Sequence, residues 1–265
     1  MSPRSTSQPR TAPRAHLLSN GNYSVMLNVH GSGYSQWHDM AVTRWREDAT
    51  RDPWGSYLLL RDEDSIELWS PTQQPCGKGS AEDTAAFAPG SATFDRHYDG
   101  IHSKLEVAVA SDADVELRRL TLTNSGNTPR SLSVTAYAEV VIGPIGADNA
   151  HPAFSKMFVQ TDWDASNHLL LATRRRRATS EAKVWAAQAL QVEGQPATAE
   201  FDTDRSRFIG RGHTLHNAQA MQHGARLSGT TGCVLDPVFA LRQRMTLAAG
   251  SSVTVLLWTQ LADSR

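Results

Sequence analysis

The sequence lacks the features that would place it in several common protein classes. Its two cysteines, Cys76 and Cys233, lie far apart and form no framework of the kind found in small secreted domains. We therefore expect unpaired thiols and a cytoplasmic location, where disulfides are rare. No apolar run approaches the roughly 20 residues of a membrane span. The N-terminus has no apolar segment of a secretory signal.

Charge and motif content exclude further classes. The chain has 26 Lys and Arg against 27 Asp and Glu, whereas a nucleic-acid-binding protein usually has a basic excess. We therefore expect no nucleic-acid partner. No Gly-rich phosphate motif follows a strand-like segment, and we expect no cofactor. The ten histidines show no metal-ligand spacing except an HxxH at His213 and His216 in a Gly/Asn-rich loop, so we expect no metal.

The chain also lacks sustained helical periodicity and is instead organised as short strands. Residues 1–15 are rich in Ser, Pro and Arg and are predicted to be a disordered tail or linker. Residues 16–265 are predicted to be one all-β domain of about twelve to sixteen strands, as a sandwich or barrel. Polar and apolar residues mix on both faces of Val115–Leu122, which predicts a sheet covered on both sides.

One stretch, Gly31 to Pro75, is unusually rich in tryptophan and charge. Four of the seven tryptophans lie here, around a charged block at Arg44–Asp52 that has neither helical nor strand periodicity. Aromatic faces beside Arg, Asp and Gln suit pyranose sugars, because the ring stacks on indole while planar polar groups bridge hydroxyls. The alternative is that the tryptophans are core residues and the charges form a solvated loop.

We place a candidate carbohydrate site in this block. Its residues are Trp37, Arg44, Arg46, Arg51, Asp52, Trp54, Gln73 and Gln74. The arginines offer planar donor forks for vicinal hydroxyls or for a phosphate. Pro53 stiffens the loop before Trp54, which would reduce the ordering cost of binding.

No catalytic set is evident. The candidate carboxylates of an inverting glycosidic cleavage are Glu47, Asp48, Asp52 and Asp148. Each is better explained by an ion pair with Arg44, Arg46 or Arg51, or by solvent. An Asp beside an Arg is held ionised, which is the wrong state for a general acid.

Long segments of the sequence resemble one known family. They are GSGYSQW (31–37), AVTRWREDATRDPWG (41–55), LWSPTQQP (68–75), HLLSNGNYSVML (16–27), VELRRLTLTN (115–124), YAEVV (137–141), HPAFSKMFVQT (151–161), SRFIGRG (206–212) and TGCVLDPVFALRQR (231–244). They look like the N-terminal β-sandwich domain of the cellobiose-phosphorylase-type enzymes, glycoside hydrolase family ninety-four. Within that family they are most similar to the phosphorylase-like region of cyclic β-1,2-glucan synthases.

The resemblance implies a large two-sheet antiparallel supersandwich of the galactose-mutarotase-like type. In the family, the catalytic residues belong to an (α/α)₆ barrel that follows the sandwich, and this chain stops where that barrel would begin. We therefore expect no catalysis by the chain alone. The expected role is to bind a β-glucan oligosaccharide or position a substrate for the missing barrel. The alternative is a structural or homodimerising module. The resemblance further allows the parent enzyme to be associated with the inner membrane.

A third hypothesis, a mutarotase-like sugar epimerase, needs a His and Glu pair on the concave face of a sheet. The candidates are His97, His102 or His151 with Glu106 or Glu139, and no motif selects among them.

Overall fold

The computed structural model describes residues 4–6, 14–48, 50–65, 67–80, 82–179, 181–196 and 200–265. These residues form eighteen β-strands, three short α-helices and two 3-10 helices. The strands are β1 (Arg4–Thr6), β2 (Ala15–Ser19), β3 (Tyr23–Asn28), β4 (Gly33–Trp37), β5 (Met40–Thr43), β6 (Tyr57–Asp62), β7 (Leu68–Trp69), β8 (Thr84–Ala88), β9 (Ser91–Tyr98), β10 (Ile101–Val109), β11 (Val115–Asn124), β12 (Arg130–Pro144), β13 (Val159–Asp164), β14 (Leu169–Arg174), β15 (Trp185–Val192), β16 (Glu200–Asp204), β17 (Pro237–Leu247) and β18 (Ser252–Ala262). The helices are α1 (Ile145–Ala150), α2 (Pro152–Lys156), α3 (Arg205–Ile209), η1 (Leu215–Asn217) and η2 (Gln219–Met221).

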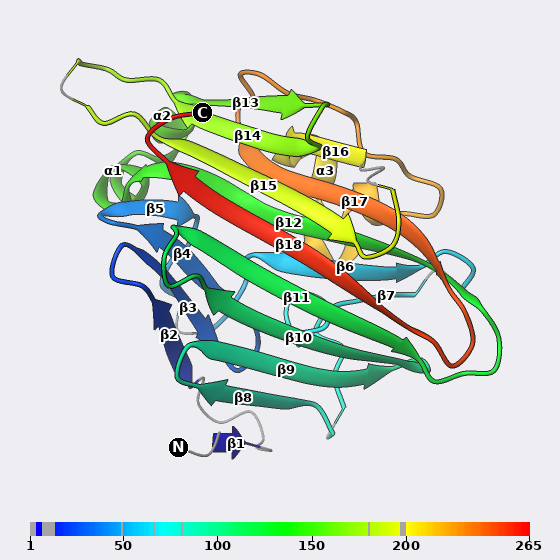
Figure 1. Cartoon of the computed structure of the whole chain (residues 1–265). Helices are drawn as coiled ribbons and strands as arrows, with labels where there is room; N and C mark the ends of the chain where they lie inside the picture. The colour runs from blue at the N-terminus through cyan, green and yellow to red at the C-terminus, as the bar shows by residue number, and fades with distance from the viewer. Residues whose placement is uncertain are drawn as a thin grey trace.

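The strands form two antiparallel sheets that pack face to face (Figure 1). The first sheet has the order β1-β8-β9-β10-β11-β18-β15-β14-β13. The second has the order β16-β17-β12-β5-β4-β3-β2, and β6 and β7 join it through β12. In Figure 1 the red strand β18 crosses the middle of the nearer sheet. It pairs with β11 on one side and β15 on the other, so it joins two meanders into one sheet.

Strand β12 organises the second sheet. One edge pairs with β17, and the other pairs first with β6 and then with β5. The register shifts between Val140 and Gly143, where buried Ile142 has a φ of 40°. A bulge bends the strand that contains it, and a positive φ disfavours a β-branched residue, so the surrounding packing must hold this conformation. The bulge lies within the β5 pairing, shortly before β12 leads into α1.

Two hydrophobic clusters hold the sandwich together. The larger lies between the sheets. The smaller lies on the other face of the second sheet, beneath α3, η1 and η2, and includes Leu59, Tyr137, Phe208 and Met221. Because both faces are covered here, every residue of β6 is buried. A continuous apolar strand such as the YLLL at the start of β6 suits such a position.

The all-β, two-sheet prediction is confirmed, and the described helices are short. The strand number exceeds the predicted range, in part because β1 and β7 are too short to show alternation. The prediction that residues 115–122 are covered on both sides is wrong. β11 buries alternate residues, and the opposite face is partly exposed.

The mixed pattern of β11 has a physical cause. Glu116 and Arg118 point into the sandwich and pair at 2.6 Å. Glu116 also accepts hydrogen bonds from Tyr23 at 3.2 Å and Ser35 at 2.5 Å, while Arg118 donates to the carbonyl of Ser56 at 2.7 Å. Buried charges need such partners. At this end of β11 the polar side chains therefore face inward.

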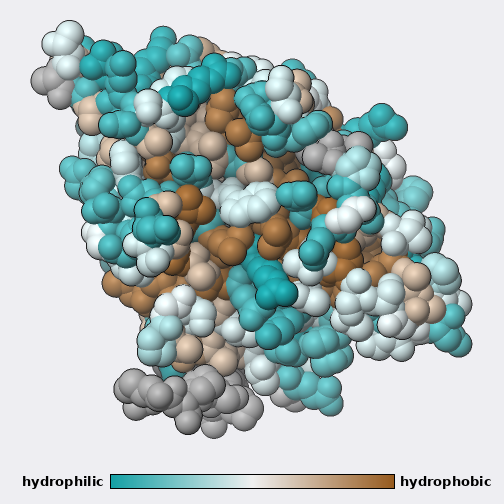
Figure 2. Space-filling model, viewed as in Figure 1, coloured by the Kyte–Doolittle hydropathy of each residue, from teal (hydrophilic) through white to brown (hydrophobic). Residues whose placement is uncertain are grey.

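The apolar side chains at this end of β11 face outward instead. Leu117 pairs across the strands with Trp258, which pairs in turn with Ala189, and Leu256 lies on the same face. We call these four partly exposed residues the outer-sheet patch. Figure 2 shows apolar surface across this face of the molecule.

The remaining predictions about the chain fare as follows. Cys76 and Cys233 are unpaired, as expected. Most of residues 1–15 lies outside the described residues, and within it Arg4–Thr6 pairs with β8 while Ala15 begins β2. For the rest of residues 1–15, the disordered tail or linker therefore stays a prediction. None of the helices in the described ranges has the length and apolar character needed to cross a bilayer.

Candidate functional site

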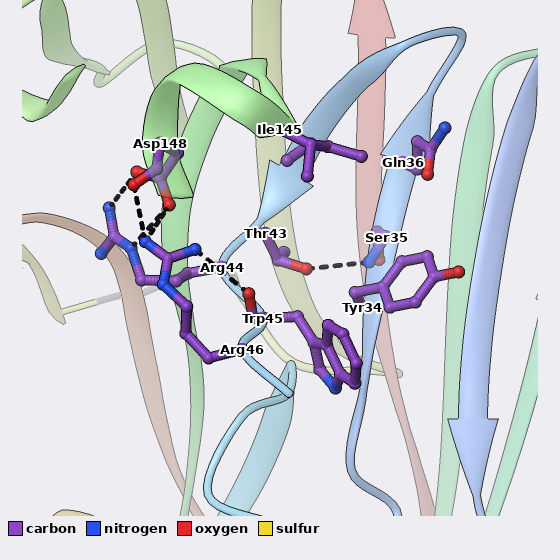
Figure 3. A pocket seen from close by; sticks show the side chains of 10 residues that line it. Tyr34, Ser35, Gln36, Thr43, Arg44, Trp45, Arg46, Ile145 and Asp148 are labelled. Carbon is purple, nitrogen blue, oxygen red and sulfur yellow. Dashed lines mark hydrogen bonds and ion pairs between the residues drawn. The ribbon is translucent and has the colours of Figure 1, made fainter. Parts of the chain in front are cut away.

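A pocket of about 170 Å³ opens where β4, β5 and α1 meet (Figure 3). It is lined by Tyr34, Ser35, Gln36, Ala41, Thr43, Arg44, Trp45, Arg46, Ile145 and Asp148. The first eight of these residues come from the β4–β5 hairpin and the chain just after it. The last two come from α1, about a hundred residues later in the sequence.

The local sequence explains how the hairpin forms this wall. In β4, Gly33, Ser35 and Trp37 are buried, whereas Tyr34 and Gln36 are partly exposed on the opposite face. The backbone N–H of Ser35 donates to Oγ1 of Thr43 at 2.8 Å. Beyond β5 the backbone N–H of Arg44 still donates to the carbonyl of Glu139, at 3.0 Å. Residues 44–46 therefore leave the sheet along β12, beside α1.

The open side of the pocket is aromatic and apolar. Trp45 is 38% exposed, and its ring meets that of Tyr34 edge-on, with centroids 5.7 Å apart and planes at 60°. Figure 3 shows these two rings side by side, with Ile145 of α1 across the pocket from them. Ile145 is 40% exposed. Two neighbouring aromatic rings with one accessible face suit an apolar ring surface of a ligand.

The inner side of the pocket is ionic. Arg44 is buried, and its guanidinium pairs with three carboxylates: Glu139 at 2.7 Å, Asp148 at 3.2 Å and Asp236 at 3.3 Å. Each of these carboxylates also forms an ion pair with a second cation: Asp148 with Arg46 at 2.5 Å, Glu139 with Arg205 at 2.7 Å and Asp236 with Lys156 at 2.7 Å. We call these seven residues the Arg44 cluster. Because each carboxylate has at least two cations, the buried charges are compensated.

The cluster fixes protonation states. Burial alone would raise the pKa of Asp148, but its hydrogen bonds and ion pairs with Arg44 and Arg46 outweigh burial and lower that pKa. Burial would lower the pKa of Arg44, yet bonding to Asp148 and Glu139 raises it. Asp148 is therefore ionised at neutral pH, as the sequence predicted for a carboxylate beside arginine.

The structure brings only two of the predicted site residues, Arg44 and Arg46, to this pocket. Trp37 is buried in the main core, and its Nε1–H donates to Asp114 at 2.7 Å. Arg51 is exposed and pairs with Asp48 at 3.0 Å, the kind of partner that the sequence predicted for Asp48.

Of the other predicted residues, Asp52 and Gln74 contact His30, away from the pocket lining. Nδ1 of His30 lies 3.1 Å from Asp52, and its carbonyl accepts from the backbone N–H of Gln74 at 2.9 Å. Trp54 is half-buried, and its carbonyl accepts from the N–H of Gly33 at 2.9 Å. Gln73 is half-buried and precedes Gln74 in the same turn. The predicted set therefore does not come together at one site: Arg44 and Arg46 line the pocket, and the other six residues lie outside its lining.

Sequence reasoning missed most of the pocket wall, including the residues that form its open side. Tyr34, Gln36, Trp45 and Ile145 were absent from the predicted set. The sequence did contain a signal for Trp45, which stands between two arginines. Ile145 could not be found locally, since only the bend of β12 places α1 beside the hairpin.

The HxxH spacing has a local explanation. Nδ1 of His213 lies 2.9 Å from the carbonyl of Asn217, and Nδ1 of His216 lies 2.6 Å from Oγ1 of Thr214. Both rings therefore take part in the hydrogen bonding of the η1 turn.

Comparison with known proteins identifies the family of the chain. Residues 2–265 match the family described as glycosyl hydrolase 94, supersandwich domain. The chain is 38% identical over 250 residues to cyclic β-(1,2)-glucan synthase NdvB of Rhizobium meliloti (strain 1021), covering 94% of this chain and 9% of that protein. It is 24% identical over 247 residues to N,N′-diacetylchitobiose phosphorylase of Vibrio proteolyticus, covering 91% of this chain and 30% of that enzyme.

Among solved structures, a candidate aldose 1-epimerase of Escherichia coli K12 is similar at 10% identity and a TM-score of 0.49, covering 95% of this chain and 99% of that chain. The match to the family spans nearly the whole sequence, and the observed fold is the two-sheet antiparallel sandwich expected of it. The chain belongs to the glycosyl hydrolase 94 supersandwich domain family.

Proposed function

We propose that this chain is a non-catalytic carbohydrate-binding or substrate-positioning domain of a β-glucan-active phosphorylase or cyclic β-1,2-glucan synthase. The observation that carries the proposal is the aromatic pocket at Trp45 and Tyr34 beside the Arg44 cluster. By their descriptions, the two sequence relatives named above are a cyclic β-(1,2)-glucan synthase and an N,N′-diacetylchitobiose phosphorylase, and the chain spans only 9% and 30% of their lengths.

The pocket suits one sugar ring of a longer chain. Its volume of about 170 Å³ is below the roughly 300–1,000 Å³ of pockets that enclose drug-sized ligands. The exposed face of Trp45 offers a stacking surface. Arg46 lies at the rim with 28% of its side chain exposed; its two terminal nitrogens donate to the carbonyls of Trp45 and Asp148 and to the side chains of Asn149 and Asp148, which leaves its Nε–H to meet a hydroxyl. Arg44 has its donors committed to carboxylates, so it would hold the wall in place without touching the sugar.

The chemistry of the pocket supports a binding role without turnover. Asp148, the carboxylate in the lining, is held ionised by Arg44 and Arg46 and so has no proton to give to a leaving oxygen. We expect no phosphorolysis or hydrolysis of β-glucosides by this chain alone. Turnover that persists through purification, and is lost in Asp148→Asn, would overturn this expectation.

Calorimetric titration with β-1,2-gluco-oligosaccharides and with cello-oligosaccharides tests the proposal. A few contacts predict a Kd near 1 mM, about −4 kcal/mol. Trp45→Ala should abolish binding, whereas Trp258→Ala, a matched change on the other sheet, should leave it unchanged. The double change Arg46→Ala with Trp54→Ala tests the predicted block and should remove binding without unfolding. Flat titrations of the native chain, or equal binding by the Trp45 variant, would refute the site.

The outer-sheet patch favours a second candidate, a structural or homodimerising module. Apolar patches on protein surfaces often mark interaction sites. Sedimentation velocity over a hundredfold concentration range, with Trp258→Ser as the variant, distinguishes the two roles. Self-association that this variant abolishes favours the second candidate. A monomer at all concentrations, together with sugar binding, favours the first.

We propose a cytoplasmic location for the chain. Its support is the pair of unpaired thiols, Cys76 and Cys233. Fractionation of the cells that produce the protein would test it, and recovery outside the cytoplasm would contradict it.

A further inference from the structure

Two histidines and a carboxylate meet on the outer face of the first sheet. Asp95 and His97 stand two residues apart on β9, and His102 of β10 pairs directly with His97 across the strands. Nε2 of His102 lies 2.9 Å from Oδ1 of Asp95. The two imidazoles stack with centroids 4.2 Å apart and planes at 8°. One ligand atom from each of the three residues lies within 4.8 Å of the others.

We propose that Asp95, His97 and His102 bind one divalent transition-metal ion, with Zn²⁺ as the best-suited ion. Two imidazoles and one carboxylate form a ligand set that zinc accepts, with water in the remaining position. The same nitrogen-rich set disfavours Mg²⁺ and Ca²⁺, which prefer oxygen ligands. This site lies on the first sheet, whereas the proposed sugar pocket lies on the second, so the two proposals stand or fall separately.

The distances fit a shared ion after one small movement. Two ligand atoms on a zinc ion, each about 2.1 Å from it, stand about 3.0–3.4 Å apart. The separation of 2.9 Å between His102 and Asp95 is already close to this range. His97 is exposed, so its ring can rotate toward the other two atoms without disturbing the core.

The backbone holds the ligands in register before any ion arrives. β9 and β10 are joined by the two-residue turn Asp99–Gly100, in which both residues have positive φ. A hairpin turn of this length fixes the register of its strands, so His97 and His102 remain opposite each other. Such preorganisation lowers the cost of ordering the ligands on binding.

The lysine that stands opposite Asp95 pairs with another carboxylate. Lys104 stands opposite Asp95 in the β9–β10 register, but its Nζ pairs with Glu106 at 3.2 Å. Asp95 is therefore available to an ion that also satisfies the two histidines. The bound ion would cross-link β9 and β10 and stabilise the folded chain, because it binds the native state alone.

The test is calorimetric titration of the tag-free, chelator-treated chain with Zn²⁺. A second titration uses Co²⁺, whose binding is measured by its visible absorption. One equivalent should bind, and His97→Ala and His102→Ala should each weaken binding at least tenfold. Asp95→Asn should also weaken it. His216→Ala is the matched control, since it removes the HxxH spacing, and it should leave the affinity unchanged.

Thermal unfolding provides the independent measurement. Saturating Zn²⁺ should raise the Tm of the native chain and of the His216 variant, and should not raise that of the double variant His97→Ala with His102→Ala. The proposal is overturned if Zn²⁺ binds the native chain and the double variant equally, if it binds neither, or if His216→Ala alone abolishes binding.

Discussion

Arg44 and Arg51 belong to the same charged block, yet the structure predicts opposite consequences of removing them. The side chain of Arg44 is 3% exposed and pairs with three carboxylates, whereas that of Arg51 is 77% exposed and pairs with Asp48 alone. The substitutions Arg44→Met and Arg51→Met remove the charge and keep most of the volume. They therefore compare a buried with an exposed ion pair in one segment.

The magnitude follows from what remains after each change. Removing one partner of a buried ion pair costs about 3–5 kcal/mol, because a charge is left buried without compensation. Here Glu139 would keep Arg205, and Asp148 would keep Arg46. We therefore expect Arg44→Met to cost about 3 kcal/mol, the lower end of that range. An exposed pair contributes at most about 1 kcal/mol, which bounds the cost of Arg51→Met.

Urea unfolding, monitored by far-ultraviolet circular dichroism, measures the loss of stability in both variants. With a slope near 3 kcal/mol/M, the Arg44 variant should unfold at a urea concentration about 1 M below that of the native chain. The Arg51 variant should shift by no more than about 0.3 M. If the two midpoints coincide, the Arg44 cluster does not stabilise the fold and the physical argument for it fails.

Three further predictions follow from the structure. The pKa values of Asp62 and Asp148 are lowered in the folded chain, because bonds from backbone N–H groups or arginines outweigh burial, so the unfolded chain takes up protons first. The free energy of unfolding should therefore fall as the pH drops through about 4. A urea midpoint of unfolding that stays constant from pH 6 to pH 3 would contradict this. Gly33→Ala should cost about 2–3 kcal/mol, because an added Cβ would meet the carbonyl of Met26, while Gly146→Ala in α1 meets nothing and should be neutral or slightly stabilising; equal effects in thermal unfolding would count against the β3–β4 packing. Burial raises the pKa of Cys76 to about 12, so iodoacetamide at pH 8 should alkylate exposed Cys233 first, and mass spectrometry showing prior modification of Cys76 would be inconsistent with the fold.

The sequence predicts the class of fold well because period-two patterns report burial on one face of a strand. It is misleading where a second layer covers the other face. In β12, Ser133 and Thr135 alternate with apolar residues, as on a solvent-exposed surface, yet both are buried. Arg242 of β17 donates to Thr135 at 2.9 Å and to the carbonyl of Ala220 at 2.6 Å, so the polar face is covered by the η2 segment. No pattern within β12 itself could reveal this cover.

The candidate site was less predictable for a related reason. A charged loop without periodicity can be solvated, bind a ligand or form buried pairs, and local sequence does not distinguish these outcomes. The partners of Arg44 lie 95, 104 and 192 residues along the chain. They come together only because β12 bends at its bulge and α1 follows directly. Similarly, the cross-strand pair of His97 and His102 depends on a register that spacing rules for metal ligands do not consider.

The division of the charged block has a functional consequence for the proposed sugar site. Residues whose side chains are fully engaged in the fold contribute rigidity, and residues that remain exposed contribute contacts. Arg44 belongs to the first group and its neighbour Trp45 to the second, while Arg46 is paired with Asp148 and still has 28% of its side chain exposed. Because a buried arginine anchors the backbone between β5 and α1, the indole of Trp45 is held in place before a ligand arrives. Such anchoring lowers the ordering cost of binding, so weakening the Arg44 cluster should reduce sugar affinity even though Arg44 itself touches no sugar.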